Sequence, residues 1–581
     1  MVSITLAAQS KEGTLGDGVQ AALRKAVEFY RTKVATHGGY HFAYAEDLSY
    51  GRSEMSEGPT RVELQREGTP LVALAYLEAY EATRDEYYLE AARDVARALV
   101  KGQYCSGGWD YYIEFDPAKR AQFPYRVDGS CSTRSVPPTQ TRARGARGGV
   151  VPASDAPGGG QGSRPSTLDD NVTQANTRVL MRVDRELEFK ERQIHEAARF
   201  ALDSLVKAQY PNGAWPQRYS SFPDPKGFPV KRASYPQSWP RTWPGSNYFD
   251  HYTFNDNSIV DAIDTMLEAA RIYREPRYLA SAEKGGEFIL LAQMPEPQPG
   301  WAQQYDRDMH PAWARRFEPP SITGGESQSI MRALIVLYRE TGMRKYLEPL
   351  PRALAYYKRS LLPDAEQRSE IRRRACPGRT PCAARFYELK TNRPLYITKG
   401  TRVTALGQGT TTVDGYDLSY SDQSVITHYG VLTSGAGFAE IEREYNDIQN
   451  ADPSSLKRPE RLHGLSPWSD ARWHTGADAQ PRDRRSLESR VRAVIDAMDP
   501  RGAWLEEGTI GKANRLVSVF AGKELVVMLG GKTMTMKEND TLEVFSGPEP
   551  PKERIVRSRT FAENVGVLSA YVRNRSSPAR R

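Results

Sequence analysis

The stretch Tyr252-Thr253-Phe254-Asn255-Asp256-Asn257 stands at the mouth of a predicted helix. Apolar residues at helical spacing, from Ile259 to Ala270, indicate that helix. Asn and Asp are preferred N-cap residues because their side-chain oxygens accept unpaired N–H groups of the first turn. One such residue completes a cap, whereas three are present here, and a weaker copy occurs at Thr167-Leu168-Asp169-Asp170-Asn171. The plain interpretation is a capped core helix, and the recurrence favours polar residues gathered at a site.

An amphipathic helix that ends before a glycine-aromatic turn recurs along the chain. Three copies run from an opening apolar residue to a tryptophan 20, 21 and 22 residues later: Leu89 to Trp109, Ile194 to Trp215, and Leu279 to Trp301. Partial copies lie at residues 26–40 and 491–504. A repeat of this kind indicates one structural unit used several times.

The repeated helix has a partner helix, so the unit is a helix pair. The partners are predicted at Leu71–Ala82, Val172–Leu187, Ile259–Ile272 and Ile330–Tyr338. Two helices joined by a short turn form an αα-hairpin, and such a unit cannot bury its apolar face without neighbours. We therefore predict an all-α fold over residues 1–430, an α/α toroid or an incomplete one. Its long loops on one side are the place where function is expected.

Residues 431–581 are predicted to continue the toroid with further helices. Phe561–Val572 is a candidate closing helix, while Leu525–Met528 and Asn539–Phe545 have the composition of strands. The Arg-rich end, Arg573–Arg581, is expected to be a disordered basic tail.

Two irregular segments interrupt the repeat, at residues 120–166 and 365–383. Both are rich in Arg, Gly, Pro and Ser and lack periodicity, which is typical of disorder. Each is either a surface excursion or a defect in the gene model. Without the second segment, Arg385 would take the place that the tryptophan holds in the other units.

The charge and the cysteines exclude several classes of protein. The 581-residue chain has a net charge of +8, but residues 128–166, 365–384 and 573–581 carry +3, +3 and +4, so the rest of the chain is about neutral to slightly acidic. A basic face for nucleic acid is therefore not indicated. Four cysteines in so long a chain do not indicate a disulfide framework, and no second pair at metal spacing supports zinc. No apolar run is long enough to span a membrane, Met1–Ala8 is too short for a complete secretory signal, and we take the chain as a monomer.

Polar clusters recur in the loops and at the helix starts. They are Asn255/Asp256/Asn257, Arg315/Arg316/Phe317/Glu318, Gly325/Glu326/Ser327, Arg385/Tyr387/Glu388 and Asn392/Arg393. Arg binds carboxylates bidentately, and Asp and Glu oxygens suit Ca²⁺, so these residue types suit an acidic sugar. The alternatives are ion pairs for each Arg and hinge packing for Trp215 and Trp301. We find neither a phosphate-binding loop nor a nucleophile elbow.

Several of these stretches together resemble the toroidal pectate lyases, the pectic acid lyase family. The motifs occur in the family's order over about residues 167–430, and they are Tyr210–Gln217, Tyr252–Asn257, Pro311–Ser321, Gly325–Ser327 and Ala384–Glu388. The resemblance implies cleavage of polygalacturonate, or pectate, by β-elimination with Ca²⁺ to give 4,5-unsaturated oligogalacturonides. It also implies a secreted or periplasmic protein.

The same resemblance implies roles for particular residues. Arg385 is expected to be the catalytic base, with Arg316 second, while Asp256 and Glu318 would hold Ca²⁺ and Asp256 would act in catalysis. An Arg base has a pKa above about 12, which predicts activity that rises toward alkaline pH. The residues implied in substrate binding are Trp215, Arg218, Asn255, Asn257, Tyr305, Arg315, Glu326, Tyr387, Lys390, Asn392 and Arg393.

Two other functions stay open on the sequence. A toroidal glycoside hydrolase would use a carboxylate pair such as Asp256 and Glu326 as acid and base, without a metal. A non-catalytic toroid would bind an acidic polysaccharide through the same clusters but lack a base in position. Displacement of Arg385 by the preceding insert would favour the second function.

Overall fold

The computed structural model describes residues 15–129, 131, 151–152, 164–245, 248, 251–363, 369–399, 403–407, 409–414, 416–423, 425–426, 429–456, 484–510, 514–519, 524–529, 532–537, 541–546 and 551–576. Its main part is built from helix pairs, as the repeat predicts. The pairs are α2 (Thr69–Thr83) with α3 (Glu86–Gly102), α5 (Val172–Glu186) with α6 (Arg192–Ala208), α7 (Ser258–Tyr273) with α8 (Pro276–Ala292), and α9 (Glu326–Thr341) with α10 (Leu350–Ser360).

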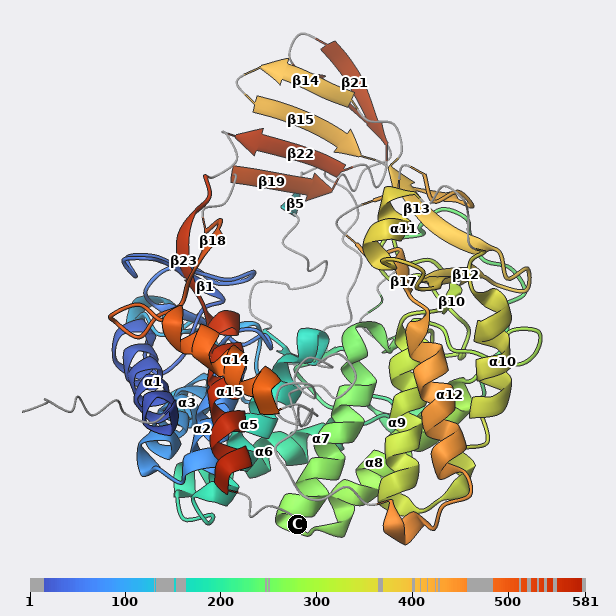
Figure 1. Cartoon of the computed structure of the whole chain (residues 1–581). Helices are drawn as coiled ribbons and strands as arrows, with labels where there is room; N and C mark the ends of the chain where they lie inside the picture. Colours follow the sequence, from blue (N-terminus) through green and yellow to red (C-terminus); the bar gives the residue numbers. More distant parts are fainter. Residues whose placement is uncertain are drawn as a thin grey trace, which may run out of the picture.

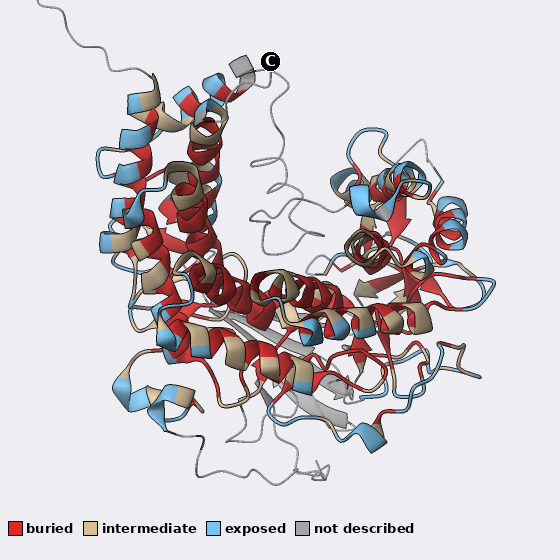
Figure 2. Ribbon diagram, turned by 90° about the horizontal axis from the view of Figure 1, so that it is seen from below, coloured by how far each residue is buried: buried red, intermediate tan, exposed pale blue. Residues whose placement is uncertain are grey.

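The first helix of each pair lies inside and the second lies outside. In α2 every residue from Thr69 to Ala79 is buried, whereas α3 is buried along one face and exposes Lys101. Contacts run from α2 to α5, then to α7 and α9. Figure 2 shows the helices as an arc whose packed sides are buried. The predicted all-α, incomplete α/α toroid is confirmed.

Helices from both ends of the chain extend this arc. α15 (Ser558–Ser576) packs on α2, on α1 (Leu15–Phe29) and on α14 (Arg484–Asp496), and α12 (Ala436–Ile448) packs on α9 and α10. Figure 1 shows the blue N-terminal helix beside the red C-terminal helix. The closing helix expected at 561–572 is therefore present. It continues through Arg573, which pairs with Glu81 at 3.8 Å, so the basic tail begins later than expected, and residues 577–581 lie outside the described part.

A glycine turn follows α1, α3, α6 and α14 for a structural reason. Gly38, Gly107, Gly213 and Gly502 all have positive φ, which glycine adopts without a Cβ clash. At Gly213 a Cβ would lie 1.9 Å from the carbonyl oxygen of Lys284. The Nε1 of the tryptophan that follows donates a hydrogen bond to a backbone carbonyl of the preceding helix. In Trp215 this bond goes to the carbonyl of Leu205 at 2.8 Å. The tryptophans are thus part of the packing between units.

A short strand before each inner helix pairs with a strand after an outer helix. The pairs are β3 (Arg61–Glu63) with β4 (Tyr112–Glu114), β6 (Ser166–Thr167) with β7 (Arg218–Tyr219), β8 (Tyr252–Thr253) with β9 (Gln304–Tyr305), and β10 (Ser321–Thr323) with β12 (Phe386–Glu388). Each ladder therefore joins the two loops that flank one helix pair, at the start of its inner helix.

The region after residue 500 departs from the expected helical continuation. Residues 505–557 contain β18 (Leu505–Gly508), β19 (Asn514–Val519), β20 (Glu524–Leu529), β21 (Lys532–Lys537), β22 (Thr541–Ser546) and β23 (Glu553–Arg557). The strand-like composition at 525–528 and 539–545 therefore predicted this region more accurately than the expected continuation of the helices did. β22 and β19 join β14 (Val403–Gly407), β15 (Gly409–Asp414) and β5 (Val151–Pro152) in a five-stranded sheet. It lies above the helices in Figure 1.

The cysteines form two disulfides, which corrects the expectation from the sequence. Cys105 bonds to Cys131, and Cys376 bonds to Cys382, with Cα–Cα distances of 5.4 and 5.7 Å. Proximity in the fold, and not spacing along the chain, decides such pairs. Cys105 and Cys131 are 26 residues apart and meet where the first irregular segment begins. Most of that segment, residues 130, 132–150 and 153–163, lies outside the described residues, so its expected disorder stays a prediction.

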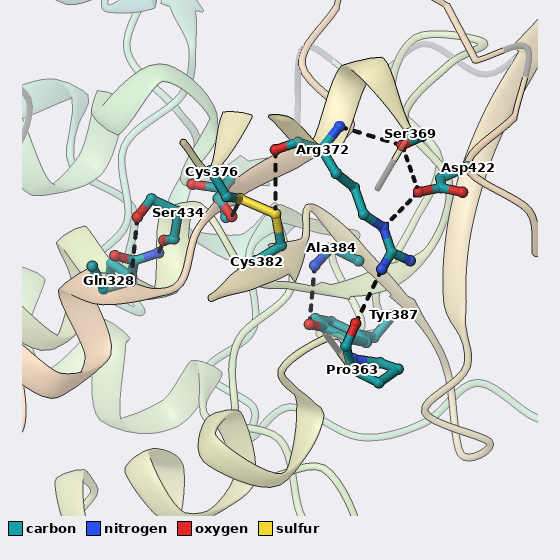
Figure 3. The surroundings of a disulfide bond; sticks show 12 residues. Gln328, Pro363, Ser369, Arg372, Cys376, Cys382, Ala384, Tyr387, Asp422 and Ser434 are labelled. Atoms are coloured by element: carbon teal, nitrogen blue, oxygen red, sulfur yellow. Dashed lines mark hydrogen bonds and ion pairs between the residues drawn. A yellow bond between two sulfur atoms is a disulfide. The ribbon is translucent and has the colours of Figure 1, made fainter. Parts of the chain in front are cut away.

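The second irregular segment is ordered over residues 369–383. It contains the helix α11 (Glu370–Ala375) and ends in β11 (Cys382–Ala384), which pairs with β17 (Leu432–Ser434). Figure 3 shows the disulfide between α11 and β11, with Arg372 donating to Asp422 and to the carbonyl of Pro363 at 2.5 and 3.2 Å. These contacts hold the segment to the toroid, so the expected disorder is wrong there.

Two further chain segments add strands to this side of the arc. β13 (Pro394–Lys399) and β16 (Tyr416–Ser419) extend the ladder of β10 and β12 into a four-stranded sheet. At the other end of the arc, β1 (Ala43–Ala45) and β2 (Gly51–Arg52) form a sheet with β18 and β23. In the described residues no helix is both long and apolar enough to span a membrane.

Candidate active site

Two turns of the same shape precede α5 and α7. The backbone amide of Leu168 donates to the backbone carbonyl of Gln217, and that of Phe254 donates to the backbone carbonyl of Gln303, both at 2.8 Å. Asp170 and Asn171 have φ of 49° and 59°, and Asp256 and Asn257 have φ of 49° and 62°. Asp and Asn tolerate this left-handed region better than most residues do. Neither Asn171 nor Asn257 caps its helix with its side chain, so the N-cap interpretation is wrong and the recurrence has another cause.

The two turns contact each other and bring three carboxylates together. Carboxylate oxygens of Asp169, Asp170 and Asp256 all lie within 4.8 Å of one another. We call these three residues the carboxylate centre. Asp170 and Asp256 also line a cavity of about 340 Å³ at the mouths of the inner helices, together with Gln65 and Arg66.

Neighbouring side chains fix the two aspartates of the first turn. The hydroxyl of Tyr111 donates to Asp169 at 2.8 Å, and Arg218 lies 3.7 Å from the same carboxylate. Gln65 donates to Asp170 at 3.3 Å. Of these partners, Arg218 is a residue implied by the resemblance, and the structure places it at the carboxylate centre.

The pKa values of two of these carboxyl groups are raised. Burial and then the charge of Asp169 raise the pKa of both Asp170 and Asp256 well above the usual range for Asp. Repulsion of this kind is relieved by a proton or by a cation. Three carboxylates whose oxygens converge are also the hard ligands that Ca²⁺ prefers. The residues of the carboxylate centre therefore fit a calcium ion.

Arg385 reaches the second turn from the opposite side. Its guanidinium donates to Asn255 and Gln303, both at 3.1 Å, pairs with Glu326, and lies 4.2 Å from the ring centroid of Tyr429. Burial lowers the pKa of Arg385, but the charges of Glu326, Tyr429 and Asp256 outweigh it and raise the pKa above the ordinary value for Arg. The insert before Arg385 has not displaced it from the site.

The strand register shows which repeat position Arg385 occupies. The backbone carbonyls of Gln217 and Gln303 accept from the backbone amides of the residues that follow β6 and β8. The backbone carbonyl of Arg385 accepts in the same way from the amide of Gly324, which follows β10. Arg385 is therefore equivalent to those glutamines and lies two residues beyond the tryptophan position. The expectation that it replaces a tryptophan is wrong by two residues, because the insert cannot be aligned by length alone.

Arg315 and Glu318 form a second ion pair of the site. Arg315 donates to Glu318 through Nε and Nη2 at 2.9 and 2.8 Å. Burial raises the pKa of Glu318, but Arg315 outweighs it and brings that pKa to about 2. The negative charge of Glu318 is thus neutralised by Arg315, and Glu318 is not one of the three converging carboxylates. The charge of Arg315 also lowers the pKa of Asp256, which places Arg315 beside the carboxylate centre.

Tyr429 links the two arginine pairs. Its hydroxyl lies 3.1 Å from Asn255, 3.3 Å from Gln303 and 2.7 Å from Glu318. Sequence reasoning missed Tyr429, which stands alone in an irregular loop without a motif around it. It also missed Asp169 and Asp170 as ligands, although the recurrence of the turn could have identified them.

The other residues implied by the resemblance lie in different parts of the fold. Trp215, Tyr305 and Tyr387 are buried in the core and donate to the carbonyls of Leu205, Ala292 and Ser360, so their rings pack between units. Arg316 lies 4.6 Å from the Tyr416 ring. Lys390, Asn392 and Arg393 lie in the turn after β12, where Asn392 is held by Tyr356 and Ser360. Asn255, Asn257 and Glu326 lie at the site.

Comparison with known proteins matches part of the chain to a family. The model of the family described as pectic acid lyase matches residues 152–408. No curated protein matches the chain. Among solved structures, the family 10 polysaccharide lyase from Cellvibrio cellulosa shares 18% identity over 66% of this chain and 100% of that chain, with a TM-score of 0.40. A mutant of that lyase in complex with trigalacturonic acid shares 18% identity over 65% of this chain and 98% of that chain, with a TM-score of 0.40.

An alpha-mannanase from Bacteroides thetaiotaomicron is also similar, at 9% identity over 97% of both chains with a TM-score of 0.35. TM-scores this low carry no argument about fold or function. The family model does carry one, and it confirms the resemblance that the motifs show. Residues 152–408 are therefore similar to the pectic acid lyase family.

Proposed function

We propose that the protein is a pectate lyase that cleaves polygalacturonate by Ca²⁺-dependent β-elimination. The observation that carries the proposal is the carboxylate centre beside Arg385, with Asn255 of the same turn donating to Asp256 and accepting from Arg385. A cation site and a strong basic group are the two things that elimination next to a uronate carboxylate needs.

The proposed calcium ligands are Asp169, Asp170 and Asp256. When bound there, Ca²⁺ supplies positive charge that neutralises a uronate carboxylate and stabilises the charge that develops as the neighbouring proton leaves. This ligand set keeps Asp256 from the expected pair. Asp169 and Asp170 take the place of Glu318. Arg218 and Tyr111 orient Asp169 within this set.

Arg385 is the proposed base, and Arg316 is the weaker candidate. Arg385 contacts the turn that carries Asp256, whereas Arg316 lies over the ring of Tyr416. In the reaction the base takes the proton from C5, the electron pair forms the C4–C5 double bond, and the bond from C4 to O4 breaks. Because neighbouring anions raise its pKa, Arg385 holds its own proton near neutral pH, and turnover by this route increases with pH.

The two disulfides support a location of the protein outside the cytosol. Disulfides persist in oxidising compartments and are rare in the cytosol. Cys105–Cys131 and Cys376–Cys382 therefore support the expected secreted or periplasmic location.

Ultraviolet absorbance during incubation with polygalacturonate tests the proposal. A rise that a chelator abolishes and Ca²⁺ restores is the expected result, since elimination creates an unsaturated uronide. New reducing ends without that absorbance would contradict it and indicate hydrolysis. Binding without either signal would indicate a non-catalytic toroid, so the same samples should be assayed for binding.

A further inference from the structure

A second cluster of arginine and aromatic side chains lies on the surface beyond the carboxylate centre. The guanidinium carbon of Arg393 is 3.4 Å from the ring centroid of Tyr420, and that of Arg241 is 4.7 Å from the Trp239 ring. Arg241 also donates to the Tyr420 hydroxyl at 3.1 Å. We call Trp239, Arg241, Arg393 and Tyr420 the outer stack.

The outer stack is exposed and positively charged. Tyr420 is 39% exposed, and the Arg241 side chain is 46% exposed. Glu388 pairs with Arg241 and accepts from Tyr420 at 2.7 Å, so it balances one of the two positive charges. Within the described residues Arg393 pairs with no carboxylate and rests on the aromatic ring alone. Its guanidinium is therefore available to an anion from outside.

The loop that carries Trp239 and Arg241 is fastened to a segment of the active site. Trp243 donates from Nε1 to the carbonyl of Ala314, and Trp313 donates from Nε1 to that of Pro240, both at 2.8 Å. Arg315 follows Ala314 directly. These two bonds hold the outer stack in a fixed position relative to Arg315.

The outer stack is also connected to Arg385 through a single strand. Glu388 ends β12, which begins one residue after Arg385. Three residues of extended chain span about 10 Å, so the backbones under the two sites are separated by about that distance. A short oligosaccharide spans such a gap. A polygalacturonate chain that runs along this strand from the carboxylate centre would reach the outer stack.

The chemistry of the outer stack matches a chain of uronates. Its guanidinium groups take carboxylates, and the aromatic faces of Trp239 and Tyr420 provide flat apolar surface for sugar rings. A cavity of about 250 Å³ opens beside it, lined by Trp239, Trp313, His251 and His310. Guanidinium groups need no metal to bind carboxylates, in contrast to the carboxylate centre, where the acidic side chains offer the substrate carboxylate no positive charge unless a cation is present.

We propose that the outer stack is a binding site for galacturonate residues of a long polygalacturonate chain, remote from the bond that is cleaved. This inference rests on the proposed function for the identity of the polymer. The site gives the protein a preference for long chains over short ones, and its contribution to binding persists when Ca²⁺ is removed.

The test compares binding of long and short ligands to matched variants. The double variant Arg241→Gln with Arg393→Gln is titrated with polygalacturonate and with trigalacturonate, in an Asp256→Asn background that prevents turnover. The control is Arg84→Gln in the same background, because Arg84 also lies over a tyrosine, 5.3 Å from the Tyr80 ring, and pairs with Glu186 at the far end of α2. The Kd for the polymer is expected to increase roughly fivefold to tenfold in the double variant, as two exposed ionic contacts are lost. The Kd for the trimer is expected to stay within about twofold in both variants.

Several results would overturn the inference. They are an unchanged Kd for the polymer in the double variant, an equal loss in Arg84→Gln, and equally tight binding of fully methyl-esterified polygalacturonate, which lacks the charges. Tyr420→Ala gives a second measurement if the double variant unfolds, and it should weaken polymer binding in the same direction. If the unmodified protein binds the polymer through the outer stack but shows no turnover, the outer stack stands and the proposed lyase activity fails. Turnover with no preference for long chains would contradict the outer stack and leave the lyase intact.

Discussion

The turn at 168–171 and the turn at 254–257 share a backbone but differ in what surrounds them. Both place an Asp and an Asn in the left-handed region before an inner helix. Asp169 of the first turn meets Tyr111 and Arg218, whereas Asn255 of the second meets Arg385 and Tyr429. The repeat thus supplies the same scaffold twice, and the adjacent unit decides the chemistry of each copy.

This difference separates two roles within one cluster. The first turn contributes two carboxylates held by neutral and cationic partners, which suits metal binding. The second contributes Asp256, which lies beside both the other carboxylates and the two arginines. We expect changes in the second turn to affect chemistry and changes in the first to affect mainly cation affinity.

Asp256→Asn should give the largest effect of all. It removes a ligand and the charge next to Arg385, and turnover is expected to fall by at least about a hundredfold. Asp170→Asn should cost less at saturating Ca²⁺, because the charge of Arg385 is among the main influences on Asp256 but not on Asp170. Initial rates over a range of Ca²⁺ concentrations measure both. Equal losses at saturating Ca²⁺ would remove the distinction between the two turns, and Asp308→Asn, at an exposed pair with Lys231, is the control.

Arg385→Lys tests the group that faces the second turn. Lys keeps the charge but cannot donate to Asn255, Gln303 and Glu326 together, so kcat should fall roughly a hundredfold with a smaller change in KM. Unchanged kcat would exclude Arg385 as the base. The thermal midpoint of the variant separates loss of function from loss of fold.

Glu326→Gln should shift the pH dependence of turnover. The charge of Glu326 is the largest that raises the pKa of Arg385, so its removal lowers that pKa. The unprotonated fraction of Arg385 then increases at any given pH, and the alkaline limb of the pH–rate profile moves to lower pH. If the limb does not move while the protein stays folded, Arg385 is not the group that titrates.

Calcium should stabilise the protein more at pH 8 than at pH 5. The pKa values of Asp170 and Asp256 are raised by burial and mutual repulsion, so their contribution to stability is present below about pH 4 and is lost as pH rises through the folded pKa values. Ca²⁺ at about a hundred times Kd should restore about 2–5 °C in thermal midpoint at pH 8. The gain should disappear in Asp256→Asn. An equal gain at both pH values would place the ion elsewhere.

Arg316→Gln is expected to have the smallest effect. Arg316 lies over the ring of Tyr416, whereas Arg385 donates to Asn255 of the second turn, so removal of Arg316 should change kcat by less than about threefold. A loss as large as that of Arg385→Lys would move the base to Arg316. Rates at alkaline pH distinguish the two, because a base contributes most there.

Local sequence predicted the helices well and the sheets poorly. The inner and outer helices repeat an apolar period that any stretch of about 15 residues reveals, and their observed bounds lie close to those expected. The strands β6 and β8 are two residues long, and each pairs with a strand that lies beyond both helices of its own pair. The five-stranded sheet joins residues 151–152 to residues 403–407, 409–414, 514–519 and 541–546, and no local pattern contains that pairing.

The sequence by itself determined the repeated helix pairs, the recurring Asp-Asn turn and the motifs that match the pectic acid lyases over residues 152–408. These properties depend on residues close together in the chain, where periodicity and backbone preference act directly. Only the tertiary structure decided that Asp169 and Asp170 join Asp256, that Tyr429 links the two arginine pairs, and that the four cysteines bond. Each of these depends on side chains from distant segments meeting in space, and the packing of neighbouring units sets those distances.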